Sequence, residues 1–386
     1  MVRTETETTR ILIADDQADV LEALQILLKN DGFVIEAVNS PRAVLEALEN
    51  RSFDVVLLDM NYARDTTSGG EGLAMLPRIR QLDDTLPVVF MTAWGSIDLA
   101  VETMQGGGRD FVQKPWDNAK LLKTLRRQVE EGRRMRAMKQ RQQASQQLLR
   151  ELEEAGEIQR RLFPESMPRL PGLEIQAYWR PAHDIGGDYF DAIRLGDHGC
   201  VLCIADVMGK GLPAALLMSN TQAAVRATAP GATGPGDACR RINRIMAENT
   251  ASGQFVTMFY AMLDGAARTL WYTNAGHAPP ILIHCDGTVT RLNDGGPVLG
   301  VFPDAQYAER RMRLEPGDRL ALFTDGVTEV RNSKDEEFGE DRWIDLLRQH
   351  RALDAGSLRQ AALDAVESFA DRGFQDDAAL MIVSVV

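Results

Sequence analysis

Residues 11–17 and 55–61 read ILIADDQ and VVLLDMN, and in each stretch an apolar run leads directly into an aspartate. Similar runs recur through the first 130 residues, separated by amphipathic stretches of helical length. The runs lie at residues 11–13, 34–35, 55–58, 88–91 and 111–112. This alternation is typical of βαβ units and a parallel sheet. The sequence therefore predicts a five-stranded parallel sheet in a doubly wound α/β domain.

Polar side chains follow four of these runs. Asp15 and Asp16 follow the first, Asp59 the third, Thr92 the fourth and Lys114 the fifth. The carboxyl ends of parallel strands meet at one edge of a sheet, so we expect these side chains to converge. Carboxylates are the ligands that Mg²⁺ prefers, and a lysine with a hydroxyl would bind a phosphoryl group. The set is suited to phosphoryl transfer onto a carboxylate.

Four stretches carry a more specific signal: ILIADDQ, VVLLDMN, VVFMTAWGSIDLAVETM and DFVQKPW, at residues 11–17, 55–61, 88–104 and 110–116. They resemble the receiver domain of two-component response regulators, over residues 9–130. The resemblance implies that Asp59 accepts a phosphoryl group from a sensor histidine kinase. It also implies a Mg²⁺ site formed by Asp15, Asp16, Asp59 and the main-chain carbonyl of Asn61, and a conformational switch formed by Thr92, Phe111 and Lys114.

Residues 131–162 are predicted to form a helical linker, because the stretch is rich in Arg, Gln, Glu and Leu and contains no proline. Gly132 and Gly156 are the two residues that weaken it. Apolar residues from Leu148 onward have the 3–4 spacing of a coiled coil, which predicts a homodimer through this helix; a single solvated helix is the alternative. Basic residues between Arg126 and Arg141 are typical of a solvated face, with an acidic partner or nucleic acid as the alternative.

The region 163–386 mixes strand-like and helical stretches without strict alternation, which predicts an α+β fold. Strand-like runs lie at residues 201–204, 255–263, 281–283, 320–323 and 379–385. Acidic residues with glycine or strand-end neighbours occur at Asp188, Asp206, Asp325 and Asp376–Asp377. No His/Cys cluster accompanies them, and ligation by oxygen alone favours Mg²⁺ or Mn²⁺. The pattern indicates a metal-dependent phosphatase.

Motifs in this region include PAHDIGGDYFD, CIADVMGKGLPAALLM, TNAGHAPPILI, PGDRLALFTDGVTE and DDAALMIV. They resemble the SpoIIE/RsbU branch of the PPM serine/threonine phosphatases, in which two antiparallel sheets are flanked by helices. The resemblance implies two Mn²⁺ or Mg²⁺ ions, both bridged by Asp206, with the Val207 carbonyl completing one site. Asp325 and Asp376 would hold the other ion, and Asp188 would contribute through a water ligand. The family pattern favours Asp376 over Asp377.

Three other residue patterns have a structural interpretation that we prefer. The pair Cys200 and Cys203 lies inside an apolar run with no second pair to complete a zinc site. His277 is interpreted as stabilising a turn, rather than as a general acid. Lys210 could contact the substrate phosphate or be exposed in a glycine turn.

Composition limits the remaining classes of function. The 386 residues carry a formal net charge of −13, which gives no reason to expect nucleic-acid binding. The first ten residues lack the apolar core of a signal peptide, and no apolar run reaches the length of a bilayer span, so we expect a cytoplasmic protein without membrane contact. The leading hypothesis is a receiver-controlled phosphatase acting on a phosphorylated anti-sigma-factor antagonist with a STAS domain. A catalytically silent adaptor that sequesters a signalling partner is the alternative.

Overall fold

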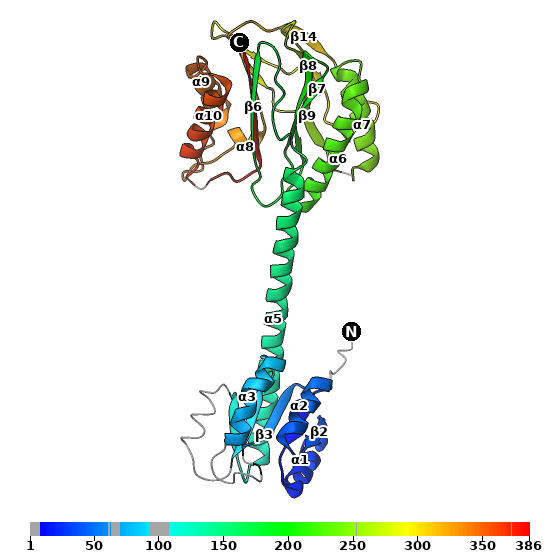
Figure 1. Ribbon diagram of the computed structural model, residues 1–386, viewed down its shortest axis with the longest axis vertical. Coiled ribbons are helices and arrows are strands. Elements are labelled where there is room, and N and C mark those ends of the chain that lie inside the picture. The colour runs from blue at the N-terminus through cyan, green and yellow to red at the C-terminus, as the bar shows by residue number, and fades with distance from the viewer. Residues whose placement is uncertain (1–7, 61, 63–69, 93–107, 252, 372) are drawn as a thin grey trace. The chain divides into compact units, whose positions relative to one another are not determined.

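The computed structural model describes residues 8–60, 62, 70–92, 108–251, 253–371 and 373–386, and side chains of residues 70–73 are not described (Figure 1). The chain divides into two compact units, Met1–Gln147 and Leu148–Val386. Each unit has buried apolar clusters of its own. No helix in the described ranges is both long enough and apolar enough to cross a bilayer.

The first unit is built on a five-stranded parallel sheet of order β2-β1-β3-β4-β5, as predicted. Its strands are β1 (Arg10–Ala14), β2 (Val34–Val38), β3 (Val55–Asp59), β4 (Val88–Thr92) and β5 (Asp110–Gln113). Its helices are α1 (Ala18–Asn30), α2 (Pro41–Asn50), α3 (Gly70–Leu82) and the start of α5 (Asn118–Arg160). Side chains of α1 and α5 fill the core on one face, and those of α2 and α3 fill it on the other.

Helix α5 is one helix of 43 residues, so the predicted boundary at residue 130 falls inside it. Leu121, Leu125 and Val129 are buried in the first unit. Five of its basic side chains form ion pairs with aspartates of the same unit: Arg126 with Asp31, Arg127 with Asp110, Arg133 with Asp54, Arg136 with Asp83, and Lys139 with Asp84. These pairs account for most of the basic run that the sequence left open.

The second unit contains two sheets, antiparallel except for one pair, β10 with β13. The first has order β13-β10-β9-β8-β7, with β14 beside β10, and the second has order β12-β11-β15-β16-β6. The strands are β6 (Leu173–Arg180), β7 (Tyr189–Leu195), β8 (Gly199–Val207), β9 (Val256–Asp264), β10 (Thr269–Ala275), β11 (Ile281–Ile283), β12 (Val289–Arg291), β13 (Gly295–Gly296), β14 (Arg310–Arg313), β15 (Arg319–Phe323) and β16 (Ala378–Val385).

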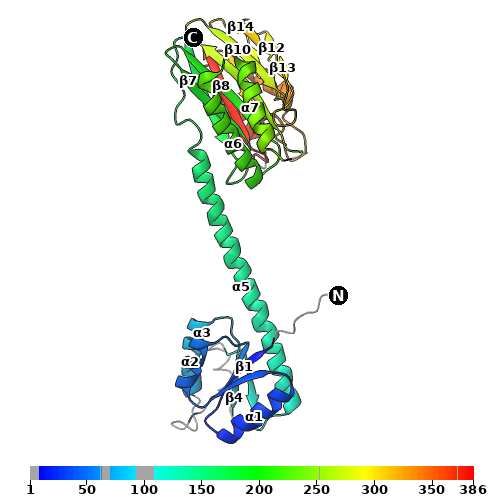
Figure 2. The same cartoon turned by 90° about the vertical axis from the view of Figure 1, so that its right-hand side faces the viewer.

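Helices cover the outer faces of the two sheets (Figures 1 and 2). They are α6 (Leu212–Thr228), the 3₁₀ turn η1 (Ala229–Gly231), α7 (Pro235–Asn249), the one-turn α8 (Asp325–Thr328), α9 (Gly339–Gln349) and α10 (Ala355–Phe369). Helices α6 and α7 lie against β7–β10, whereas α9 and α10 lie against the second sheet. The predicted sandwich of two sheets flanked by helices is therefore confirmed.

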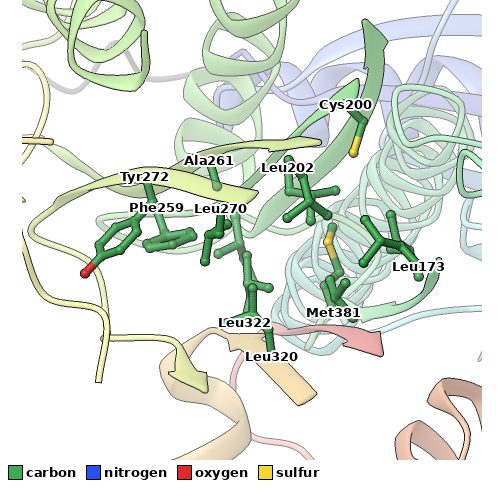
Figure 3. Close-up of a cluster of buried hydrophobic side chains, with 14 of the residues drawn as sticks. Leu173, Cys200, Leu202, Phe259, Ala261, Leu270, Tyr272, Leu320, Leu322 and Met381 are labelled. Atoms are coloured by element: carbon green, nitrogen blue, oxygen red, sulfur yellow. The ribbon is translucent and has the colours of Figure 1, made fainter. Parts of the chain in front are cut away.

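The main core of the second unit lies between its two sheets. Figure 3 shows side chains such as Leu202 of β8, Leu322 of β15 and Met381 of β16 gathered in this space. Cys200 belongs to this cluster, whereas Cys203, three residues later, packs on the helix-covered face. Both thiols are free and buried, and burial raises the pKa of Cys200 to about 12. The structural interpretation of this pair is confirmed.

Candidate functional site

The first candidate site lies at the carboxyl ends of the parallel strands. Asp15 follows β1, Asp59 is the last residue of β3, and Lys114 follows β5. The Lys114 ammonium contacts both carboxylates, with Nζ 2.6 Å from Asp15 Oδ2 and 2.9 Å from Asp59 Oδ1. The predicted convergence of these three side chains is therefore present in the structure.

Asp16 completes an acidic trio with Asp15 and Asp59, whose ligand oxygens all lie within 4.8 Å of one another. Within the described ranges, this is the only group of three His, Cys, Asp or Glu residues drawn so close. Asp15 and Asp59 are buried, whereas Asp16 is exposed. Three carboxylate oxygens at this spacing fit a hard divalent cation such as Mg²⁺.

Burial raises the pKa of Asp59, and the charges of Asp15 and Asp16 add to this shift, although Lys114 opposes it. Burial alone would lower the pKa of Lys114, but its hydrogen bonds to Asp15 and Asp59 outweigh burial, so that the pKa is raised. Lys114 therefore stays charged and is shared between two carboxylates. One ammonium for three carboxylates leaves a negative site that a cation would stabilise.

The other predicted switch residues lie around Lys114. Thr92 ends β4, and its carbonyl accepts a hydrogen bond from the Lys114 amide at 2.7 Å. Phe111 on β5 has a side chain that is 45% exposed. Asn61, expected to offer its carbonyl to Mg²⁺, lies outside the described residues.

The second candidate site is formed by the ends of strands from both sheets of the second unit. Asp206 lies near the end of β8, and Asp188 comes just before β7. Asp325 begins α8 directly after β15, and Asp376 lies just before β16. Four carboxylates separated by up to 188 residues are thus carried to one region by the sandwich.

The pKa shifts indicate that these carboxylates face one another. Burial raises the pKa of Asp206 to about 7, and repulsion from Asp325 and Asp376 contributes next. Burial also raises the pKa of Asp188, which is fully enclosed, and Asp206 adds to that shift. No three of the four described carboxylates approach within 4.8 Å, so the set is wider than the trio of the first unit. Four carboxylates with one lysine at the rim keep an excess of negative charge, and oxygen donors of this kind fit divalent ions.

Asp376 and Asp377 differ in what their carboxylates contact. Both oxygens of Asp377 accept backbone hydrogen bonds, from Ala182 N at 2.8 Å and Gly187 N at 2.5 Å. One oxygen of Asp376 accepts from the Asp377 amide at 2.9 Å, and the other contacts the ammonium of Lys210 at 2.6 Å. Asp377 is thus held by two amides of the loop between β6 and β7, whereas Asp376 is the more exposed carboxylate and lies beside Lys210. The choice of Asp376 over Asp377 as a ligand stays a prediction.

Two glycines of the motifs stand where a side chain would collide with the Asp377 region. A Cβ at Gly186 would lie 2.8 Å from the Asp377 carboxylate, and one at Gly326 would overlap the Asp377 carbonyl. The loops before β7 and after β15 can therefore each pack against Asp377 only because these residues lack side chains.

Glu329 is an acidic neighbour that the sequence did not single out. Burial raises its pKa, and Asp325 adds to the shift. Its amide donates to the Asp325 carbonyl at 2.7 Å, at the end of α8. The four-residue spacing between Asp325 and Glu329, about one helical turn, is the sequence feature that could have identified Glu329.

Asp188 also has a hydroxyl partner, since Thr324 Oγ1 donates to its carboxylate at 2.6 Å.

His277 is buried and held at both ring nitrogens. Nδ1 lies 2.8 Å from Thr257 Oγ1, and Nε2 lies 3.1 Å from the carbonyl of Phe323. Its amide donates to Asn274 Oδ1 at 2.7 Å. Burial lowers its pKa to about 4, so the imidazole is neutral at neutral pH. These contacts support the structural interpretation of His277.

Val207, whose carbonyl was expected at a metal, is buried at the end of β8.

Comparison with known proteins agrees with both resemblances. The family model "Response regulator receiver domain" matches residues 11–126, and the model "Stage II sporulation protein E (SpoIIE)" matches residues 196–386. The phosphoserine phosphatase RsbU of Bacillus subtilis is 31% identical over 240 residues, which cover 62% of this chain and 71% of RsbU.

Two further proteins extend this comparison. Protein IcfG of Synechocystis is 32% identical over 225 residues, or 51% of this chain, but the match spans only 35% of IcfG. The crystal structure of the RsbU and RsbW domains of Rv1364c from Mycobacterium tuberculosis aligns with a TM-score of 0.51 and 28% identity, over 57% of this chain and 61% of that one.

Proposed function

Because the chain belongs to the SpoIIE/RsbU family of PPM-type serine/threonine phosphatases and carries a response regulator receiver domain, we propose that it is a receiver-controlled, metal-dependent protein phosphatase. One observation carries the proposal. Asp188, Asp206, Asp325 and Asp376 converge from both sheets, and the pKa of Asp206 is raised to about 7 by burial and by its acidic neighbours. Clustered carboxylates of this kind are costly without a cation.

In the proposed reaction, Asp206, the Val207 carbonyl, Asp325 and Asp376 would hold two divalent ions. When bound, such ions activate a water molecule and stabilise charge on the phosphoryl group. Asp188, whose carboxylate accepts from the Thr324 hydroxyl, would contribute through a water ligand. Lys210, exposed beside Asp376, is available to an incoming phosphate.

In the proposed switch, Asp59 is the phosphoacceptor and Asp15, Asp16 and Asp59 hold Mg²⁺. Lys114 already contacts the Asp59 carboxylate, so it can transfer its hydrogen bond to a phosphoryl oxygen with little movement. Thr92 would donate to the same phosphoryl group, and the exposed Phe111 would rotate with it.

The proposed partners are a sensor histidine kinase and a phosphorylated anti-sigma-factor antagonist of the STAS class. The similarity to RsbU, a phosphoserine phosphatase, supports this substrate class. We also propose a homodimer through α5, because Leu148 and Leu149 are exposed and begin its 3–4 apolar spacing.

The decisive experiment measures phosphate release from a phosphoserine STAS protein with Mn²⁺. The wild type should release phosphate, Asp206→Ala should not, and beryllofluoride, which mimics phosphorylated Asp59, should change the wild-type rate. Absence of turnover in every state, with partner binding retained, would favour the sequestering adaptor.

A further inference from the structure

The last turns of α5 pack directly on the loop that carries Asp188. At Gly156 the helix approaches this loop so closely that a Cβ would overlap the carbonyl oxygen of Asp184. Only glycine permits this approach, although glycine is unfavourable inside a helix. The backbone of α5 therefore packs directly against the segment that precedes Asp188.

Gln159, one turn further along α5, binds the same loop with both ends of its side-chain amide. Its Oε1 accepts from the Gly186 amide at 2.9 Å, and its Nε2 donates to the Gly186 carbonyl at 2.7 Å. The side chain is only 3% exposed, so water does not replace these bonds. One side chain thus satisfies both backbone groups of the residue two positions before Asp188, as a neighbouring strand would.

Aromatic contacts secure the loop on the far side of Asp188. The ring of Phe163, just after α5, lies 5.2 Å from Phe190 and 6.2 Å from Tyr189 between centroids. The chain after α5 is also bonded to α6, since Gln222 Nε2 donates to the Leu162 carbonyl at 3.2 Å. The end of α5 therefore holds the segment on both sides of Asp188.

The opposite side of the loop is held by the acidic site itself. The Asp377 carboxylate accepts from the Gly187 amide, next to the Gly186 that Gln159 binds. The path from α5 to the site is consequently short: Gln159 fixes Gly186, Asp377 fixes Gly187, and Asp188 follows.

We infer that Gln159 is a positioning residue of the phosphatase site, whose amide makes the placement of Asp188 depend on the seating of α5. The inference rests on the proposed function and names its regulatory contact. Since α5 is continuous from Asn118 to Arg160, a shift or bend at the end of the helix would change the Gln159–Gly186 contact. The loop would then no longer hold Asp188 in place, and the second unit would bind metal less tightly.

The test uses the full chain with Gln159→Met, which keeps the volume and removes both hydrogen bonds. Gln146→Met, at an exposed position of the same helix, is the matched control. We expect Gln159→Met to weaken Mn²⁺ binding, measured by calorimetry, by about tenfold, the usual effect of losing a residue that orients a metal ligand. The Mn²⁺ concentration for half-maximal phosphate release should rise in parallel, with KM for the phosphoprotein unchanged and activity recovered at high Mn²⁺.

Gly156→Ala provides an independent variant. Alanine favours the helix by propensity, yet its Cβ would push α5 away from Asp184, so Mn²⁺ binding should weaken in a protein whose helix is intrinsically more stable. A purely structural role would instead lower the unfolding midpoint without changing the dependence on Mn²⁺.

Unchanged Mn²⁺ binding in both Gln159→Met and Gly156→Ala would overturn the inference. Hydrogen exchange at the Gly186 amide separates the role of Gln159 from the proposed phosphatase activity. Faster exchange with weaker Mn²⁺ binding supports the role of Gln159 even if the wild type releases no phosphate, a result that would count against the proposed function alone.

Discussion

The two acidic sites of this chain differ in how they balance their charge. In the first unit, Lys114 lies among the carboxylates and is only 17% exposed, so it offsets part of the charge of Asp15 and Asp59 from inside the cluster. In the second unit, Lys210 is 57% exposed and contacts Asp376 at the rim, while Asp206 and Asp325 form no ion pair within the part of the chain that the structure describes. Both sites keep an excess of negative charge that suits a divalent cation, and they differ in whether the lysine lies inside the cluster or at its rim.

The largest expected effect comes from removing the carboxylate at the centre of the second site. Asp206→Asn should lower Mn²⁺-dependent phosphate release by about a thousandfold or more, because the bridging ligand of both proposed ions is lost. In the metal-free protein the same change should raise the unfolding midpoint, since burial and repulsion already penalise the ionised carboxylate. Enzyme assays and thermal unfolding in chelator measure the two effects.

Asp59→Asn is the counterpart in the first unit. It should leave basal phosphate release within about twofold, because it lies outside the phosphatase site, and it should abolish the response to beryllofluoride. A loss of basal turnover as large as that of Asp206→Asn would show that the two sites do not have separate tasks.

The next prediction compares the two lysines. Lys114→Met removes the partner of two buried carboxylates and should lower the free energy of unfolding of the first unit by about 3 kcal/mol. Lys210→Met breaks one exposed ion pair and should cost less than about 1 kcal/mol. Urea unfolding of the full chain without divalent ions separates these cases, and equal losses would contradict the proposed difference in charge balance.

Most of the fold could be predicted from local sequence. The central strands β3 and β4 of the first unit are continuous apolar runs, as expected for strands covered on both faces, and they end at the polar residues Asp59 and Thr92. Strands β6, β7, β10, β12, β13 and β14 were not predicted. The strand β6 alternates buried and partly exposed residues and includes Arg180, and β7 buries the charged Asp191, which pairs with Arg226. Apolar runs alone do not detect strands of this kind.

The candidate sites were predicted less completely than the fold, because some roles depend on distant backbone. Asp376 and Asp377 are chemically identical in sequence, and only the amides of Ala182 and Gly187 distinguish them. Gln159 reads as an ordinary polar residue of a helix, since its partner Gly186 lies 27 positions later. The motifs identified the candidate ligands, whereas the groups that hold those side chains required the structure.

A last prediction concerns the response of the second unit to acid, because all five histidines lie between residues 183 and 350. His277 has a folded-state pKa of about 4 against 6.5 in a free side chain, because it is buried. Between these values the unfolded chain binds a proton that the folded chain does not, so stability is lost as pH falls below 6.5 and levels off near 4. The loss by pH 5 should be about 2 kcal/mol. Urea unfolding of the wild type and His277→Gln at each pH isolates this contribution, because the acidic cluster titrates in both proteins. An unchanged difference between the two proteins across this range would mean that His277 takes up its proton while folded, which its hydrogen bonds to Thr257 and Phe323 argue against.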